Sequence, residues 1–323
     1  MKKEVIVLGG GFCGITAAKI LENKKEINLT LIDKKSYFEY SPGLHELVAQ
    51  PNLYKNMIIP FKEILKNTNL IHEKVEKVEP GRVKTEKRTK EFDYLIIGAG
   101  ANYPIFIEDR NVFTVTSVEN TLNLSKKVQN SESIAVIGGG PIGTEVTGEI
   151  ITKTPGKEVT LIHLRDRLLE RGPKKASYHA KKFLKENGAE VVLGEKIVEH
   201  PPEKFLTDQG KEIEADLGIW CGGIKPNIEF MEGFEDSIYS ENDALKVNNK
   251  LKLSGHQNIF AGGDINSIPE EKTAHNAEIH GYTIAENIIH SIKGKKLIGH
   301  DPQESPLLIS LGSQNGMLNF QDW

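Results

Sequence analysis

One pattern constrains this fold more than any other: a short apolar strand runs directly into a glycine-rich turn of the form GxGxxG and then into a helix. The first copy begins at Val5 and reads VIVLGGGFCGITAAKIL. Gly9 allows the tight turn, Gly11 lets the backbone approach a pyrophosphate without a Cβ in the way, and Gly14 lets the helix pack closely on the strand. The amides and positive dipole of the helix start then face the phosphates. The pattern therefore predicts a strand–helix–strand unit that binds a dinucleotide.

The strand that follows supports this prediction. It covers Asn28–Ile32 and ends at Asp33, about 20 residues after the last glycine. A carboxylate at this position can accept hydrogen bonds from both hydroxyls of an adenosine ribose. We expect the same binding site to include Phe12, Cys13, Lys34 and Pro42.

The second copy of the pattern begins at Ser133 and reads SIAVIGGGPIGTEVTGEI. Its predicted dinucleotide contacts are Gly138, Gly140, Pro141, Ile142, Gly143 and Glu145. The next strand, Glu158–Ile162, ends on His163 instead of an acid, and Arg165 and Arg167 follow. An acid there would repel a 2′-phosphate, whereas histidine and arginine can pair with one, so NADPH fits as well as NADH. The alternative is that these arginines form only a solvated loop.

Two such units in one chain imply two adenine dinucleotides. The economical pairing is one tightly held flavin and one exchanging nicotinamide, because a flavin can accept a hydride from a nicotinamide and pass electrons onward singly or in pairs. We therefore expect FAD and either NADH or NADPH. If only one of the two units binds, the alternative is a simple dehydrogenase.

Composition excludes several other classes of protein. The 41 Lys and Arg residues against 45 Asp and Glu residues give a net charge of −4, and no basic stripe with interleaved aromatics occurs, which argues against a nucleic-acid partner. The two cysteines, Cys13 and Cys221, cannot form a disulfide framework or a four-thiolate site, and we expect no metal. The sequence has no signal-peptide core and no apolar run long enough to span a bilayer. We expect a cytoplasmic protein, with peripheral contact to the inner face of a membrane left open.

Four segments resemble a known family in both motif and order. They are Val5–Gly14, Phe92–Gly100, Ile134–Glu149 and Asn258–Asp264. This set is similar to the two-dinucleotide flavoproteins, which include pyridine-nucleotide disulfide oxidoreductases, type II NADH:quinone oxidoreductases and apoptosis-inducing-factor homologues. The runs EVTLIH, LKVNNKL, GHQNIF and LISLGSQNG are similar to the ferroptosis-suppressor or apoptosis-inducing-factor-homologue branch, whose members reduce quinones.

The resemblance implies an α/β fold of two Rossmann-like domains, each with three β/β/α layers, one inserted in the other. We expect a FAD-binding domain at residues 1–109 and 251–295 and an NAD(P)H-binding domain at 110–250. A short C-terminal interface segment at 296–323 is either minimal or truncated. Whether the protein forms a homodimer stays open.

The resemblance also implies roles for individual residues. Asp264 would hold the ribityl chain of the flavin, and Glu145 would reach toward the nicotinamide. A helix over residues 273–287 would aim its amino end at the negative charge of a reduced flavin, with Lys272 as an added cation or merely a solvated side chain. Further cofactor contacts are expected at Gly98, Ala99, Gly100, Gly223, Gly263, Ala274 and His275. The family usually has Ala-Thr-Gly where this chain has Gly98, Ala99 and Gly100, so a hydroxyl contact is lost.

The acceptor side of the reaction follows from the cysteines. Disulfide reductases of this family carry CxxxxC just after the first ribose acid, and this chain has no cysteine there. Electrons must then pass directly from the flavin to a diffusing acceptor, which the resemblance implies is quinone-like. A quinone also needs two protons, for which His45, Glu46, His275 and His280 are candidates. We select His275 and Glu145 as the catalytic pair. Two alternatives stay open: a reductase of a small iron–sulfur carrier protein, and a non-enzymatic redox-sensing protein.

Overall fold

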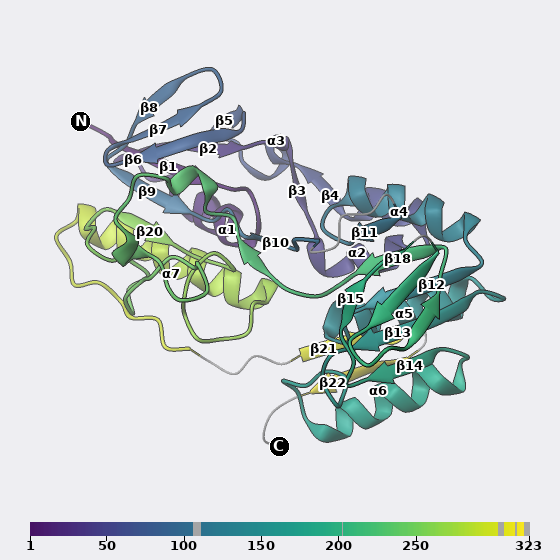
Figure 1. The fold of residues 1–323 in the computed structure, drawn as a ribbon. Coiled ribbons are helices and arrows are strands. Elements are labelled where there is room, and N and C mark those ends of the chain that lie inside the picture. Colours follow the sequence, from purple (N-terminus) through teal and green to yellow (C-terminus); the bar gives the residue numbers. More distant parts are fainter. Residues whose placement is uncertain (106–110, 202, 303–306, 314, 320–323) are drawn as a thin grey trace. The chain divides into compact units, whose positions relative to one another are not determined.

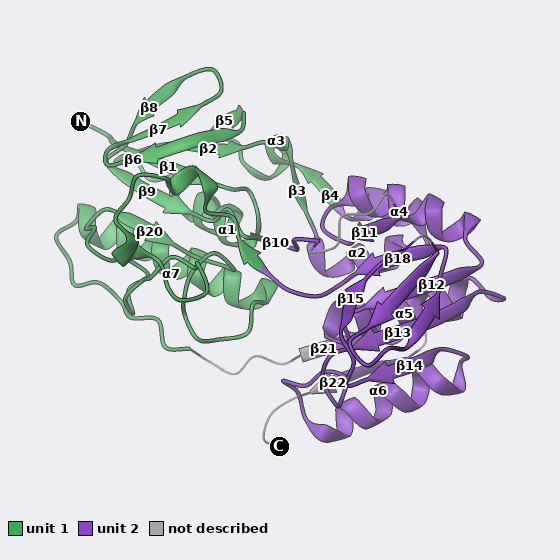
Figure 2. Cartoon of the chain, viewed as in Figure 1, with its two compact units in different colours: residues 1–39, 58–102, 225–305 green, residues 40–57, 103–224, 306–323 purple. Residues whose placement is uncertain are grey.

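The computed structural model describes residues 1–105, 111–201, 203–302, 307–313 and 315–319. The chain divides into two compact units, and each is assembled from three separate segments (Figure 2). Unit 1 consists of Met1–Glu39, Ile58–Asn102 and Lys225–Ser305, and unit 2 of Tyr40–Met57, Tyr103–Ile224 and Pro306–Trp323.

Unit 1 is built on a five-stranded parallel sheet with the strand order β20-β9-β1-β2-β5 (Figure 1). Its strands are β1 (Lys3–Leu8), β2 (Ile27–Asp33), β3 (Tyr37–Glu39), β4 (Ile58–Pro60), β5 (Asn69–His72), β6 (Val75–Glu79), β7 (Arg82–Thr85), β8 (Thr89–Glu91), β9 (Tyr94–Ile97), β10 (Ala101–Asn102), β19 (Lys225–Pro226) and β20 (Ile259–Ala261). Its helices are α1 (Phe12–Leu21), α3 (Phe61–Ile64) and α7 (Ala274–Ile292), with short 3-10 turns at Glu229–Met231 and Asp236–Ile238.

The central strand β1 explains the layers of unit 1. Its side chains alternate between two cores, as a parallel strand covered on both faces must do. Val5 and Val7 belong to a core that includes α1 and α7, whereas Ile6 and Leu8 belong to a core that includes β6 and β7. Helices therefore cover one face of the sheet and the antiparallel sheet β6-β7-β8 covers the other. This is the predicted β/β/α layering.

Unit 2 repeats the plan with a parallel sheet in the order β11-β18-β12-β13-β14. Its strands are β11 (Val112–Thr114), β12 (Ser133–Ile137), β13 (Glu158–His163), β14 (Glu190–Leu193), β15 (Ile197–Glu199), β16 (Lys204–Thr207), β17 (Glu212–Glu214), β18 (Leu217–Trp220), β21 (Leu307–Ser310) and β22 (Gly316–Asn319). Its helices are α2 (Leu44–Leu47), α4 (Val118–Asn130), α5 (Pro141–Lys153) and α6 (Lys174–Glu186), with 3-10 turns at Ser41–Gly43 and Pro51–Asn56. Ala135 and Ile137 of β12 share a core with Phe205 of β16 and Ile213 of β17. The α/β fold with two Rossmann-like sheets is therefore confirmed.

The compact units have other boundaries than the predicted domains. Residues 225–250 were expected with the second sheet but lie in unit 1, because β19 pairs with β10 and because Met231, Ile238 and Leu245 belong to a core of unit 1. Residues 40–57 lie in unit 2, where α2 packs on α4 and α5. The C-terminal hairpin β21–β22 also belongs to unit 2 and packs on α5. The predicted boundary at 109/110 falls outside the described residues. Within the described part of the chain, no helix has both the length and the apolar character needed to span a bilayer.

Candidate functional site

The first glycine-rich turn forms a tight cradle between β1 and α1. Gly9 has φ +92°, and a Cβ there would lie 2.4 Å from the carbonyl oxygen of Gly98. A Cβ at Gly14 would lie 1.9 Å from the carbonyl oxygen of Gly9. At Gly11, by contrast, a Cβ would meet no described atom within 4 Å. The outer glycines thus allow close backbone packing, and the middle one leaves the open space that a pyrophosphate needs.

The second turn has the same geometry in unit 2. Gly138 has φ +117°, and a Cβ there would lie 2.9 Å from the backbone of Cys221. A Cβ at Gly143 would lie 1.8 Å from the carbonyl oxygen of Gly138, whereas at Gly140 it would meet no described atom within 4 Å. Pro141 is the first residue of α5, a position at which the backbone N–H has no partner within the helix, so the missing N–H of proline costs nothing. Ile142 follows it in the first turn. Both turns therefore fit a dinucleotide phosphate.

The residue at the end of the second strand differs between the units. In unit 1, Asp33 Oδ2 accepts the N–H of Gly10 at 2.6 Å, and its Oδ1 accepts the N–H of Lys35 at 2.7 Å. In unit 2, His163 Nδ1 accepts the N–H of Gly139 at 3.1 Å. Its Nε2 lies 3.2 Å from Oε2 of Glu170. Glu170 is absent from the sequence-based prediction, although it lies only seven residues after His163 in the same loop.

The two arginines of this loop have different surroundings. Arg165 is exposed, which agrees with both alternatives: a solvated side chain and a residue that pairs with a 2′-phosphate. Arg167 donates instead to the backbone carbonyls of Leu169, Glu170 and Gly172. The guanidinium of Arg167 therefore stabilises a turn of its own loop through hydrogen bonds. This role differs from both sequence-based alternatives, a pairing with a 2′-phosphate and a solvated loop.

The remaining predicted residues of the first site lie around the carboxyl end of the sheet in unit 1, with one exception. Gly98, Ala99 and Gly100 follow β9, beside Gly9, and Gly263 and Asp264 follow β20. Phe12 packs edge-on against the ring of Phe38 with 5.0 Å between centroids, Cys13 is buried, and Lys34 is exposed. The exception is Pro42, which is exposed and belongs to unit 2. In unit 2, Gly223 follows β18 with φ +75°.

Helix α7 begins at Ala274, one residue later than the sequence predicted, because Thr273 is its N-cap, and the helix extends to Ile292 instead of ending at Asn287. Ala274 and His275 form its first turn, and His275 is exposed. Lys272, just before it, donates from Nζ to the carbonyl oxygens of Asn266 at 2.8 Å and Ile268 at 3.2 Å. Burial raises the pKa of the Asp264 carboxyl, and the charge of Lys272 opposes that shift. Lys272 is thus a structural cation of the loop between β20 and α7 and not merely a solvated side chain.

His280 is buried in unit 1, with 1% of its surface exposed. Its Nδ1 accepts the N–H of Gly263 at 3.0 Å, and its Nε2 lies 2.7 Å from Glu270 and 3.2 Å from Nε2 of His300. Burial lowers its pKa to about 3, so the ring is neutral at physiological pH. These three side chains match a metal-ligand set in type and spacing. However, a backbone N–H can only donate, so the ring proton must lie on Nε2, where a metal would bind. His280 therefore positions the turn at Gly263 and is unsuited to proton delivery.

A buried carboxyl cluster lies in unit 2, where α2, α5 and β21 meet. Glu145 Oε1 accepts the N–H of Ser310 at 3.1 Å, and its Oε2 lies 3.7 Å from Nδ1 of His45. Burial, together with the charges of Glu149 and Glu46, raises the pKa of Glu145 to about 7 against the effect of the Ser310 hydrogen bond. Burial also lowers the pKa of His45, so this ring is neutral at pH 7. Glu145 can therefore gain and lose a proton near neutral pH, which makes it the strongest acid–base candidate among the described residues.

The raised pKa makes a prediction about stability. Between the usual value of 4.5 and about 7, the folded protein holds a proton on Glu145 that the unfolded chain has lost. The stabilisation from this proton is complete below pH 4.5 and is lost as the pH rises through about 7. We expect Glu145→Gln to remove up to about 3 kcal/mol of the stability difference between pH 5 and pH 8, measured by urea unfolding at both values. An equal change in stability at both pH values would contradict the assignment.

Comparison with known proteins places the chain in a family. The family model for pyridine nucleotide-disulphide oxidoreductases matches residues 3–281. The chain belongs to the pyridine nucleotide-disulphide oxidoreductase family. Apoptosis-inducing factor homolog B of Dictyostelium discoideum is 31% identical over 98% of this chain and 89% of its own length. A type II NADH:quinone oxidoreductase of Staphylococcus aureus is 24% identical over 98% and 89%. The structure of NDH2 from Plasmodium falciparum in complex with NADH superposes with a TM-score of 0.88 at 18% identity and covers 100% of this chain and 91% of that one. The predicted superfamily and branch are therefore confirmed.

Disulfide reduction by a cysteine needs a reactive thiolate, and neither cysteine of this chain provides one. Cys13 belongs to unit 1, where its Sγ packs against the backbone at Gly262, and Cys221 belongs to unit 2. Burial raises the pKa of each thiol to about 12. Both cysteines therefore stay protonated at neutral pH and cannot attack a disulfide.

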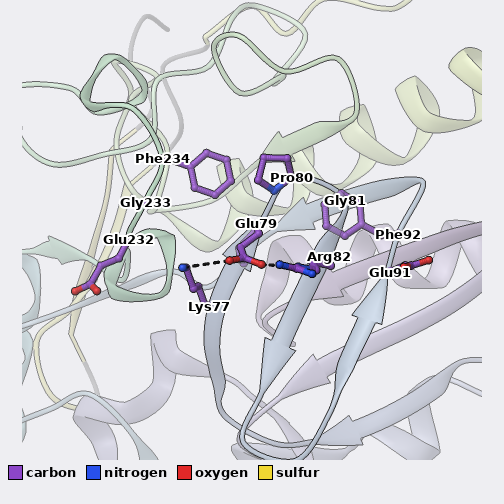
Figure 3. Close-up of a pocket in the computed structure, with 11 residues that line it drawn as sticks. Lys77, Glu79, Pro80, Gly81, Arg82, Glu91, Phe92, Glu232, Gly233 and Phe234 are labelled. Carbon is purple, nitrogen blue, oxygen red and sulfur yellow. Dashed lines mark hydrogen bonds and ion pairs between the residues drawn. The ribbon is translucent and has the colours of Figure 1, made fainter.

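Unit 1 also has a surface pocket, which touches the family segments only at Phe92. The turn between β6 and β7 and the segment around Phe234 form its walls (Figure 3). Three of its charged groups pair with one another: Glu79 lies 3.2 Å from Nζ of Lys77 and also contacts Arg82. None of the predicted site residues lines this pocket.

Proposed function

We propose that this protein is a FAD-dependent NAD(P)H oxidoreductase that passes electrons directly to a quinone-like acceptor. The observation that carries the proposal is the pair of cradles at Gly11 and Gly140, each with open space at its middle glycine. Two dinucleotides in one chain favour a flavin with a nicotinamide. The relative from S. aureus acts on NADH and quinone, and the P. falciparum structure contains NADH.

Unit 1 contains the residues suited to hold the flavin. Asp33 offers oxygen atoms near the first cradle, and Asp264 lies on the turn after β20. The start of α7 directs its positive dipole end out of the same unit. A flavin bound there would accept a hydride from a nicotinamide and release electrons singly or in pairs. The nicotinamide is assigned to the second cradle, in unit 2.

Two features favour a direct transfer to the acceptor. Burial keeps the thiols of Cys13 and Cys221 protonated, so neither supplies the thiolate that a dithiol relay needs. Glu145 holds a proton below pH 7 and is poised to supply it to a reduced acceptor. His275 stays a second predicted proton donor because it is exposed at the start of α7. The cytoplasmic location, membrane contact and homodimer stay predictions from the sequence.

Rapid-mixing spectroscopy tests the proposal. We expect the purified protein to be yellow and to lose this colour when NADH is added without oxygen. A short-chain quinone should then restore the colour faster than an iron–sulfur carrier protein does. A colourless protein with no bound flavin would overturn the flavin assignment, and restoration only by the iron–sulfur protein would overturn the quinone assignment.

A further inference from the structure

The loop after β13 carries a charge arrangement that differs from the one after β2 in unit 1. The N–H of Gly139 donates to Nδ1 of His163, which lies at the end of this strand. A backbone N–H can only donate, so Nδ1 presents a lone pair. The neutral ring must therefore carry its proton on Nε2, the atom that lies 3.2 Å from Oε2 of Glu170.

Unit 1 shows what this arrangement replaces. There the N–H of Gly10, the counterpart of Gly139, donates to Asp33 Oδ2. Nδ1 of His163 thus accepts the backbone N–H that Asp33 Oδ2 accepts in unit 1, but the neutral imidazole brings no negative charge. Glu170 supplies that charge on the far side of the ring. His163 has 5% of its side chain exposed and Glu170 has 35%, so the carboxylate is the accessible part of the pair.

Two arginines of this loop, Arg165 and Arg167, have surroundings that do not include the Glu170 carboxylate among the contacts described. Arg167 uses its guanidinium on the carbonyls of Leu169, Glu170 and Gly172, which holds the turn that presents Glu170. Arg165 is exposed, where solvent and salt weaken its field. The group in direct contact with His163 is the carboxylate of Glu170.

We propose that Glu170, held by His163, makes this protein select NADH over NADPH. A ribose 2′-hydroxyl can donate a hydrogen bond to the Glu170 carboxylate. A 2′-phosphate carries between one and two negative charges at neutral pH, so the same carboxylate repels it. The inference rests on the assignment of the nicotinamide dinucleotide to the second cradle.

Binding of the oxidised nucleotides tests the proposal without any turnover. We would titrate the flavin-loaded protein with NAD+ and NADP+ by calorimetry and compare the ratio of the two dissociation constants. Wild type should bind NAD+ at least about tenfold more tightly than NADP+. Glu170→Gln should reduce this ratio at least about tenfold, because Nε2–H of His163 becomes free to meet the phosphate. Asp166→Asn is the matched control: it removes one exposed negative charge from the same loop and should leave the ratio unchanged.

A rescue variant distinguishes two explanations for a lost preference: removal of the negative charge near the ribose, and structural damage to the loop. The double variant His163→Asp with Glu170→Gln moves the carboxylate to the strand end, as at Asp33, and should restore the preference for NAD+. Equal affinities in wild type, or an unchanged ratio in a folded Glu170→Gln protein, would overturn the inference. So would an Asp166→Asn protein that loses the preference equally. If wild type binds neither nucleotide, the proposed function fails instead.

Discussion

Replacing Gly11 by valine is expected to give a folded protein that no longer retains a flavin. Gly11 has φ −79°, which any residue can adopt, and a Cβ there meets no described atom within 4 Å. The free energy of unfolding should therefore change by about 1 kcal/mol or less. The valine side chain would instead fill the space assigned to the pyrophosphate. We expect flavin affinity to fall by about 100-fold or more, measured as flavin retained through gel filtration.

The second cradle offers a matched variant. Gly140 has φ −73°, and a Cβ there also meets no described atom within 4 Å. Gly140→Val should keep the flavin but lose its reduction by NADH, again with a folded protein. The two variants thus assign one dinucleotide to each unit. Loss of flavin in Gly140→Val with retention in Gly11→Val would reverse the assignment, and retention in both would refute the cradles as binding sites.

Replacing Glu145 by glutamine is expected to slow quinone reduction by about 100-fold, the usual scale for loss of a positioned acid. The wild-type rate should fall as the pH rises through about 7, because the carboxyl loses its proton there. The variant rate should be independent of pH across this range. Reduction of the flavin by NADH, followed in a separate half-reaction, should change only a few-fold, because hydride transfer needs no proton from Glu145.

Glu149 provides the control, one helical turn further along α5. Its carboxyl accepts a hydrogen bond from Gln50 at 3.3 Å, and its charge helps to raise the pKa of Glu145. Glu149→Gln should therefore keep the maximal rate and move the decline in rate to lower pH. If Glu145→Gln retained the wild-type rate and pH profile, proton donation would have to be sought at His275 or another group.

Much of the fold could be predicted because its strongest signals are local. A strand, a GxGxxG turn and the start of a helix occupy fewer than twenty residues, and the roles of Gly9, Gly14, Gly138 and Gly143 follow from backbone clashes within that stretch. The two parallel sheets follow from two copies of this signal. The boundaries of the two units were harder to predict from the sequence. Residues 225–250 join unit 1 through the pairing of β19 with β10 and through core contacts, and no short sequence motif indicates either of these.

The sequence by itself determined that this chain has two dinucleotide cradles and no paired thiols, since both follow from short motifs and from a count of cysteines. Only the tertiary structure decided which ionisable groups can do chemistry. Glu145 acquires a pKa of about 7 because burial desolvates its carboxyl, against the effect of a hydrogen bond from the distant Ser310. His280 is removed from proton exchange by the same cause. Desolvation depends on how segments far apart in the chain pack together, so no local pattern encodes it.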